Sequence, residues 1–70
     1  MNNIKALREK VGISQTEMSK RLGITNDYLC MIENNRRSPS LKLSMALAAE
    51  LKVTLDELFF TKKTNKMFIN

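Results

Sequence analysis

Apolar residues recur along most of this 70-residue chain at the three- and four-residue spacing of amphipathic helices. Ile4, Leu7 and Val11 follow this spacing and predict a first helix, which Gly12 ends. A second helix is predicted from Ser14, because Ser14-Gln15-Thr16-Glu17 has the form of a capping box. In such a box the Ser14 side chain accepts from a free amide, and Glu17 reaches back to Ser14.

A short turn separates the second helix from a third. Met18 and Leu22 form the buried stripe of the second helix, which ends at Gly23. After Gly23 and one further residue, Thr25 caps the third helix. Two short helices joined through a glycine in this way have the spacing of a helix-turn-helix.

The third helix has an inner and an outer side. Leu29 and Ile32 face inward, and Tyr28 lies on the boundary. The outer side carries Asn26, Asp27, Cys30 and Met31. Asn35 is expected to close the helix in the left-handed conformation that asparagine tolerates.

Two more helices follow. Ser40 opens the fourth, whose apolar positions include Leu41, Met45, Leu47, Ala48 and Leu51. Thr54-Leu55-Asp56-Glu57 is a second capping box and starts a short fifth helix, with Leu55, Leu58 and Phe59 inward. With no convincing internal strand, the prediction is an all-α, compact five-helix bundle around a central helix-turn-helix.

The chain divides into a helical domain over residues 1–60 and a C-terminal tail over residues 61–70. The tail combines lysines with the apolar run Met67-Phe68-Ile69. One expectation is a flexible, frayed end. The other is a short strand or hairpin that packs on a partner subunit and forms part of a dimer interface.

The composition excludes several classes of protein. The chain has no histidine and one cysteine, so it lacks a disulfide, a Cys–His pair and the ligands of a structural zinc site. We therefore expect no enzyme, no metal, no cofactor and no small-molecule ligand. The sequence shows no membrane segment and no signal-peptide core. We therefore expect a cytoplasmic protein with no membrane partner.

The net charge of +5 is unevenly distributed. Residues 1–42 carry +4, residues 43–60 carry −2 and residues 61–70 carry +3. An excess of positive charge indicates an anionic partner, although ordinary solubilising charge would give the same count.

Seven short motifs follow one another in order: Ile4-Lys5-Ala6-Leu7-Arg8, Ile13-Ser14-Gln15-Thr16-Glu17-Met18, Leu22-Gly23-Ile24, Tyr28-Leu29, Ile32-Glu33-Asn34, Pro39-Ser40-Leu41 and Val53-Thr54-Leu55-Asp56-Glu57-Leu58. This set resembles the phage-repressor and Cro-like helix-turn-helix regulators, also called xenobiotic-response-element-type regulators. The resemblance covers about residues 4–59. It implies that the second helix crosses the DNA backbone and that the third lies in the major groove.

The resemblance makes Asn26, Asp27 and Met31 the base-reading positions. Asparagine can bind adenine with two hydrogen bonds, and aspartate can accept from the cytosine amino group. Met31 would offer an apolar surface to a thymine methyl. The expected contacts to the DNA backbone are Gln15, Thr25, Tyr28, Asn34, Arg36 and Arg37. Each of these residues could instead be a helix cap or a solvent-exposed charge. Tyr28 could instead pack on the side of the fold that carries Leu22.

Four further residues are expected to have structural roles. The resemblance implies that Arg8 and Glu33 pair with each other and tie the first helix to the end of the third. Ser19 stands where the family usually has alanine, for close helix contact. Lys52 stands where many relatives have glycine, which predicts that the fourth helix ends differently or bears mild strain. For Cys30, a redox role would need a depressed pKa that the sequence does not show.

These observations predict a sequence-specific, double-stranded-DNA-binding transcriptional regulator that acts as a repressor. Because one reading helix contacts few base pairs, we expect a homodimer on an inverted-repeat operator. The expected dimer surface comprises Leu55, Phe59, Phe60 and Phe68. One alternative is a module that mainly binds a protein partner, such as an antirepressor or a toxin. The other is a non-specific coat on nucleic acid, driven by the basic tail.

Overall fold

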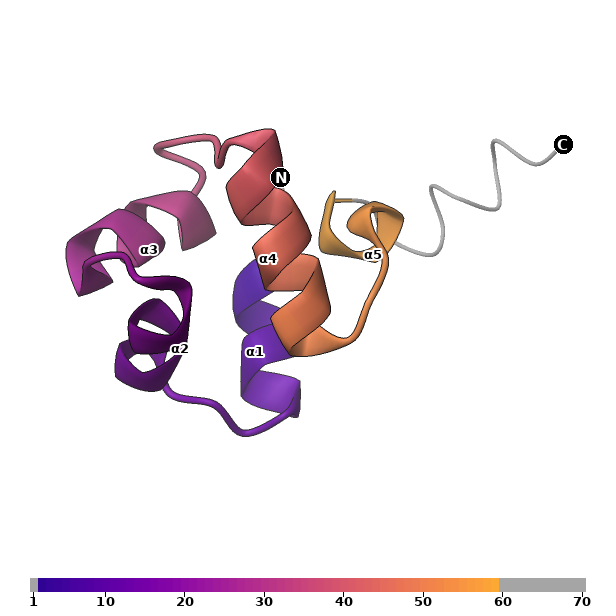
Figure 1. The fold of residues 1–70 in the computed structure, drawn as a ribbon, viewed down its shortest axis with the longest axis horizontal. Coiled ribbons are helices and arrows are strands. Elements are labelled where there is room, and N and C mark those ends of the chain that lie inside the picture. Colours follow the sequence, from indigo (N-terminus) through magenta and orange to yellow (C-terminus); the bar gives the residue numbers. More distant parts are fainter. Residues whose placement is uncertain (1, 60–70) are drawn as a thin grey trace, which may run out of the picture.

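The computed structural model describes residues 2–59 of the chain. They form five helices, α1 (Ile4–Lys10), α2 (Gln15–Leu22), α3 (Asn26–Glu33), α4 (Leu41–Leu51) and α5 (Leu55–Phe59) (Figure 1). Over residues 2–59 there is no strand, and the all-α prediction is confirmed. The predicted strand or hairpin of the tail, with Phe60 and Phe68, lies outside the described residues.

The helices begin where the local sequence predicts. The caps of three helices accept a backbone amide three residues on: Ser14 from Glu17 at 3.0 Å, Thr25 from Tyr28 at 3.1 Å and Ser40 from Leu43 at 3.1 Å. At α5 both halves of the capping box form, with 3.1 Å from Glu57 N to Thr54 Oγ1 and 3.0 Å from Thr54 N to Glu57 Oε1. At α2 the Glu17 carboxylate instead accepts from Arg21 Nε at 2.9 Å.

Within residues 2–59, two residues other than glycine adopt left-handed backbone where the chain leaves a helix. Asn35 has φ +63° just after α3, as predicted. Lys52 has φ +58° at the end of α4. This conformation favours glycine, so the strain predicted for Lys52 has a geometric basis.

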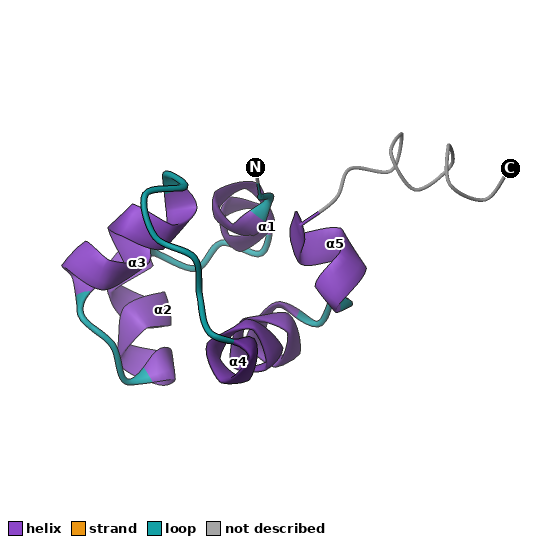
Figure 2. Cartoon of the chain, turned by 90° about the horizontal axis from the view of Figure 1, so that it is seen from above, coloured by secondary structure: helices purple, strands orange, loops and turns teal. Residues whose placement is uncertain are grey.

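The core lies between all five helices. It consists of Ile4, Met18, Leu29, Ile32, Leu47, Ala48, Leu51 and Leu58. Figure 2 shows α2 and α3 on one side of the bundle and α5 on the other, with α1 and α4 between them. A single core thus sets the direction in which α3 presents its outer side.

Four apolar residues of the predicted helices are exposed. Val11 is 51% exposed because it follows the last residue of α1, where the chain turns away. Leu41 and Met45 are 69% and 57% exposed. At 100° per residue they lie on a flank of α4, next to the face that Leu47 and Leu51 bury. Leu55, expected to point inward, is 37% exposed.

The start of the chain holds the ends of two helices. Asn3 N donates to Leu58 O at 2.7 Å, and Asn3 Nδ2 donates to Glu57 O at 3.0 Å. Asn2 Nδ2 donates to Ile32 O and to Asn35 Oδ1, each at 2.9 Å. The residues before α1 therefore bind α5 and the end of α3 together.

Candidate nucleic-acid interface

The connection between α2 and α3 is a tight turn over residues 23–25. Gly23 has φ +71° and caps α2, and Ile24 N donates to Ser19 O at 3.0 Å. The Ile24 side chain packs against the core, which fixes the angle at which α3 leaves the turn. The three expected base-reading residues all lie outside the core. Asn26 and Asp27 are exposed in the first turn of α3, and Met31 is half-buried one turn later.

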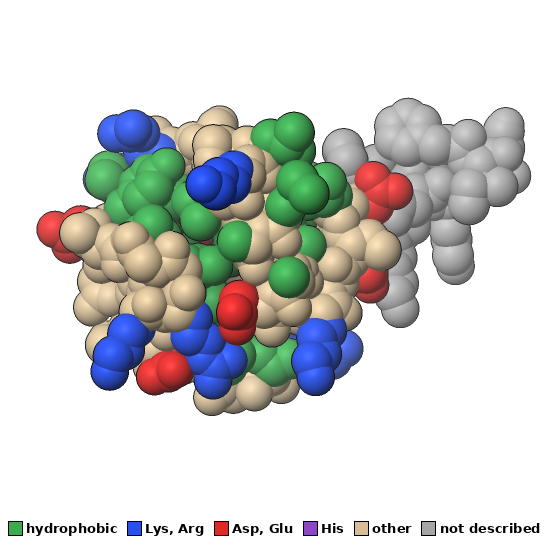
Figure 3. Space-filling view, viewed as in Figure 1, with side chains coloured by type: hydrophobic (Ala, Val, Ile, Leu, Met, Phe, Trp, Pro, Cys, Tyr) green, Lys and Arg blue, Asp and Glu red, His purple; other side chains and the backbone are tan. Residues whose placement is uncertain are grey.

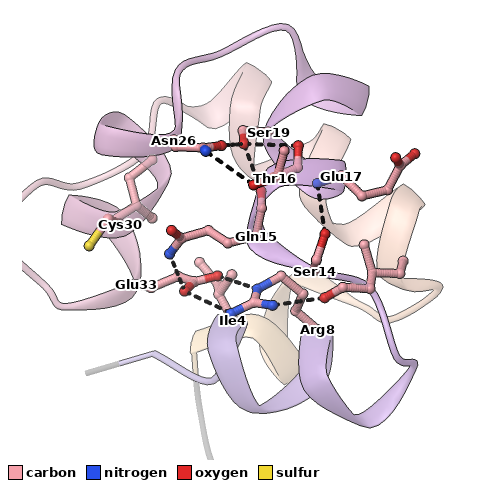
Figure 4. Close-up of polar contacts among 12 residues, drawn as sticks. Ile4, Arg8, Ser14, Gln15, Thr16, Glu17, Ser19, Asn26, Cys30 and Glu33 are labelled. Carbon is pink, nitrogen blue, oxygen red and sulfur yellow. Dashed lines mark hydrogen bonds and ion pairs between the residues drawn. The ribbon is translucent and has the colours of Figure 1, made fainter.

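Asn26 is held by two hydroxyl groups of α2. Its Oδ1 contacts Ser19 Oγ, and its Nδ2 donates to Thr16 Oγ1 at 3.2 Å (Figure 4). The sequence predicts close packing for Ser19 and does not predict a contact for Thr16. The signal for this contact is weak, because it depends on the angle between the two helices rather than on spacing within either one.

Arg8 and Glu33 form an ion pair between α1 and the last residue of α3. Arg8 Nε donates to Glu33 Oε2 at 2.7 Å, and Nη2 donates to Oε1 at 3.2 Å. The side chains are 8% and 2% exposed. A further bond runs from Arg8 Nη1 to Ile13 O at 2.7 Å. The hydrogen bond to Glu33 raises the pKa of Arg8, against the desolvation that lowers it.

The same carboxylate orients Gln15 at the start of α2. Gln15 Nε2 donates to Glu33 Oε1 at 3.1 Å. Figure 4 shows Gln15 between the Arg8–Glu33 pair and the group formed by Asn26, Ser19 and Thr16. An amide nitrogen has two hydrogens, so one N–H of Gln15 remains for an external acceptor. The sequence alone does not predict the hydrogen bond from Gln15 to this ion pair.

The loop after α3 carries the other expected backbone contacts. Asn34 Nδ2 donates to Cys30 O at 2.9 Å and to Cys30 Sγ at 3.3 Å, so the amide nitrogen of Asn34 already has two partners. Arg36 and Arg37 are exposed. The Arg37 guanidinium lies 5.6 Å from the centre of the Tyr28 ring, within cation–π range.

Tyr28 is half-buried and borders a shallow pocket of about 260 Å³. The pocket is lined by Leu22, Ile24, Tyr28, Ser40, Lys42, Leu43 and Ala46. Tyr28 therefore lies on the side of Leu22, one of the two positions expected for it. On the face of the molecule seen in Figure 1, Figure 3 shows apolar side chains gathered in several places, with separate basic groups around them.

The residues expected at a dimer surface are only partly within the described chain. Leu55 is exposed, whereas Phe59 is half-buried and packs against the core. Across residues 2–59 no cluster of side chains has the composition of a metal site. No helix in that range is long and apolar enough to span a membrane.

Several known proteins are similar to this chain in sequence. Residues 4–58 match the model of a family described as Helix-turn-helix. An uncharacterized HTH-type transcriptional regulator of Archaeoglobus fulgidus is 30% identical over 56 residues, which is 80% of this chain and 79% of that protein. The ImmF control region 10 kDa protein of Bacillus phage phi105 is 39% identical over 59 residues, covering 84% of this chain and 66% of that protein.

A solved structure is also similar, that of the hypothetical transcription factor NHTF from Neisseria. Its TM-score is 0.79 at 26% identity, over 97% of this chain and 78% of that chain. The likeness therefore extends over both the helix-turn-helix and the helices that support it.

Proposed function

Because this chain belongs to the helix-turn-helix family of DNA-binding transcriptional regulators, we propose that it represses transcription by binding an inverted-repeat operator as a homodimer. The observation that carries the proposal is the shared placement of Asn26 and Gln15. Both lie at helix starts, both are oriented by other side chains, and both keep free hydrogen-bonding groups. Such an arrangement suits one helix in the major groove and another across the backbone.

In this proposal α3 reads bases through its outer side. Asn26 binds adenine, and Asp27 accepts from the amino group of cytosine. Met31 packs on a thymine methyl. An acidic side chain near phosphates lowers affinity, so Asp27 contributes selectivity at some cost in binding.

Backbone contacts surround this helix. Gln15 donates its remaining N–H to a phosphate near the start of α2, where free backbone amides also favour an anion. Thr25 accepts as a cap and keeps its own proton for donation. Arg36 and Arg37 supply charge from the loop. Asn34 must give up a contact to Cys30 before its amide nitrogen reaches a phosphate.

Dimerisation doubles the number of base pairs that are read. A single α3 covers too few for a unique genomic site, whereas two copies related by a two-fold axis read an inverted repeat. We place the dimer surface on α5 and the tail, with the exposed Leu55 at its edge.

Selection of bound duplexes from a random DNA pool at near-physiological salt tests the proposal. An inverted repeat among the enriched sequences is the expected result. A single half-site would contradict the symmetric dimer and keep specific binding. The absence of enrichment would overturn sequence-specific recognition and favour the protein-partner or nucleic-acid-coating alternatives.

A further inference from the structure

A polar contact across the helix-turn-helix joins the two helices at Asn26, the first residue of α3. Ser19 Oγ contacts Asn26 Oδ1, and Asn26 Nδ2 donates to Thr16 Oγ1 at 3.2 Å (Figure 4). Ser19 and Thr16 are three residues apart, so they lie on one face of α2. The Asn26 carboxamide is therefore held at both of its polar atoms by a single helix face.

Ser19 is an anchored partner in this contact. It is 1% exposed, and its Oγ lies 2.6 Å from Gln15 O on its own helix. Its hydroxyl has one proton for three acceptors, which are Gln15 O, Thr16 O at 3.3 Å and Asn26 Oδ1. Either the proton goes to Asn26, or it goes to a backbone carbonyl of α2 and Ser19 accepts from a turned Asn26 amide. Both arrangements hold the carboxamide in the same plane.

The contact leaves Asn26 with the groups needed to bind a base. Nδ2 has a second N–H, and Oδ1 has a second lone pair. One donor and one acceptor, side by side, are what asparagine uses for the N7 and N6 edge of adenine. Asn26 is itself exposed, so an unheld side chain would have to be ordered on binding, which weakens its discrimination between bases.

On the premise of the proposed function, we propose that Ser19 and Thr16 are positioning residues that set the base preference of Asn26. They act by fixing the plane in which the amide meets the groove. If Ser19 only fills space between α2 and α3, alanine would serve equally well at this position.

The test compares the enriched DNA sequences and duplex affinities of the full chain with those of Ser19→Ala, Asn26→Ala and the double variant. Asn26→Ala is expected to abolish the preference at one base position in each half-site. Ser19→Ala is expected to reduce the preference at that same position by about three- to tenfold. Preferences at other positions and affinity for random DNA stay unchanged. The double variant behaves as Asn26→Ala alone.

Thr16 offers a matched pair of changes on an exposed residue. Thr16→Val removes the hydroxyl at nearly constant size and is expected to lower the same preference, whereas Thr16→Ser keeps the hydroxyl and the preference. Ser44→Ala is the control, because Ser44 is also buried but donates to Ser40 O at 2.9 Å within the α4 region. A thermal melt of each variant separates a loss of folding from a change in preference.

Three results would overturn the inference while leaving specific binding intact. The first is that Ser19→Ala and Thr16→Val both keep the full base preference. The second is that Ser19→Ala changes the base preference even when Asn26 is already alanine. The third is that Asn26→Ala leaves the enriched DNA motif unchanged. The failure of the wild-type chain to enrich any sequence overturns the proposed function itself, and with it the premise of this inference.

Discussion

Arg8 and Glu33, 25 positions apart in the sequence, meet as an ion pair with side chains only 8% and 2% exposed. Glu33 also accepts from Gln15, so one carboxylate connects α1, the start of α2 and the end of α3. The pair thus fixes the two helices that the proposed function places on DNA.

Removing one member of this pair should be severe. Glu33→Gln leaves the Arg8 charge buried without its counter-ion, and we expect the free energy of unfolding to fall by about 3–5 kcal/mol. Urea denaturation measures the loss. Glu17→Gln is the control, since the pair of Glu17 and Arg21 is exposed to solvent and contributes little to stability. Equal effects of the two changes would contradict a structural role for the buried pair.

Arg8 should not lose its charge near neutral pH. Glu33 raises the pKa of Arg8 above its ordinary value, which is already far above neutral. A raised pKa contributes stability that is fully present below the unfolded value and is lost only as pH rises through the folded one. Between about pH 6 and 9, we therefore expect the free energy of unfolding to depend on pH in the same way in the wild-type chain and in Arg8→Met. A loss of stability over this range that occurs in the wild type and is absent from Arg8→Met would contradict this assignment.

Lys52→Gly should stabilise the domain. Lys52 has φ +58°, and relief of this left-handed strain is worth about 1 kcal/mol. The melting temperature measures the gain. Ala49→Gly, at an exposed position inside α4, should instead cost about 1 kcal/mol. A loss of stability in both variants would show that the Lys52 side chain contributes more than its backbone conformation costs.

Arg36→Ala should weaken binding to all DNA sequences equally. One lost phosphate contact lowers the slope of log affinity against log salt by about 0.9. Titrations at several salt concentrations measure the slope. Lys52→Gly removes the same charge at the other end of α4, so it should leave the slope nearly unchanged. A similar decrease in both variants would indicate an effect of net charge alone.

Asp27→Asn should change selectivity and raise non-specific affinity. The substitution removes a negative charge next to phosphates, and it removes the acceptor pair proposed for cytosine. Discrimination at that base should fall by about 1–3 kcal/mol, as measured with duplexes that differ at one position. Glu9→Gln, which removes a negative charge at an exposed position of α1, is the control and should alter neither quantity.

Deletion of residues 61–70 should yield a folded monomer. Among residues 2–59, the buried core runs from Ile4 to Leu58 and draws on all five helices, so the helical content should persist in circular dichroism. Sedimentation equilibrium reports the oligomeric state. A dimer that survives the deletion would remove the tail from the proposed interface, and Leu55→Glu would then test α5 alone.

Local chemistry made the helices predictable. A cap such as Thr25 acts within three residues, and its effect does not depend on the rest of the fold. The flank of α4 was harder, because a helix rich in apolar residues does not reveal which stripe is covered. Leu41 and Met45 are apolar positions of this helix like Leu47 and Leu51, yet they are exposed.

Contacts between helices set the limit for the candidate site. The family resemblance implies the pairing of Arg8 with Glu33. The helical spacing separately places both residues at the edge of a buried face. The bonds from Gln15 to Glu33 and from Asn26 to α2 depend on the angle of the turn at Gly23, which no spacing within one helix encodes.

The hydrogen bonds of Asn2 and Asn3 also bear on how the domain opens. They link elements that are far apart in the sequence, because the residues before α1 bind both α5 and the end of α3. Neither α1 nor α5 can peel away alone without breaking these bonds. Amide hydrogens of α1 and α5 should therefore exchange with solvent as one cooperative unit, at rates close to those of the core, rather than as two independently opening helices.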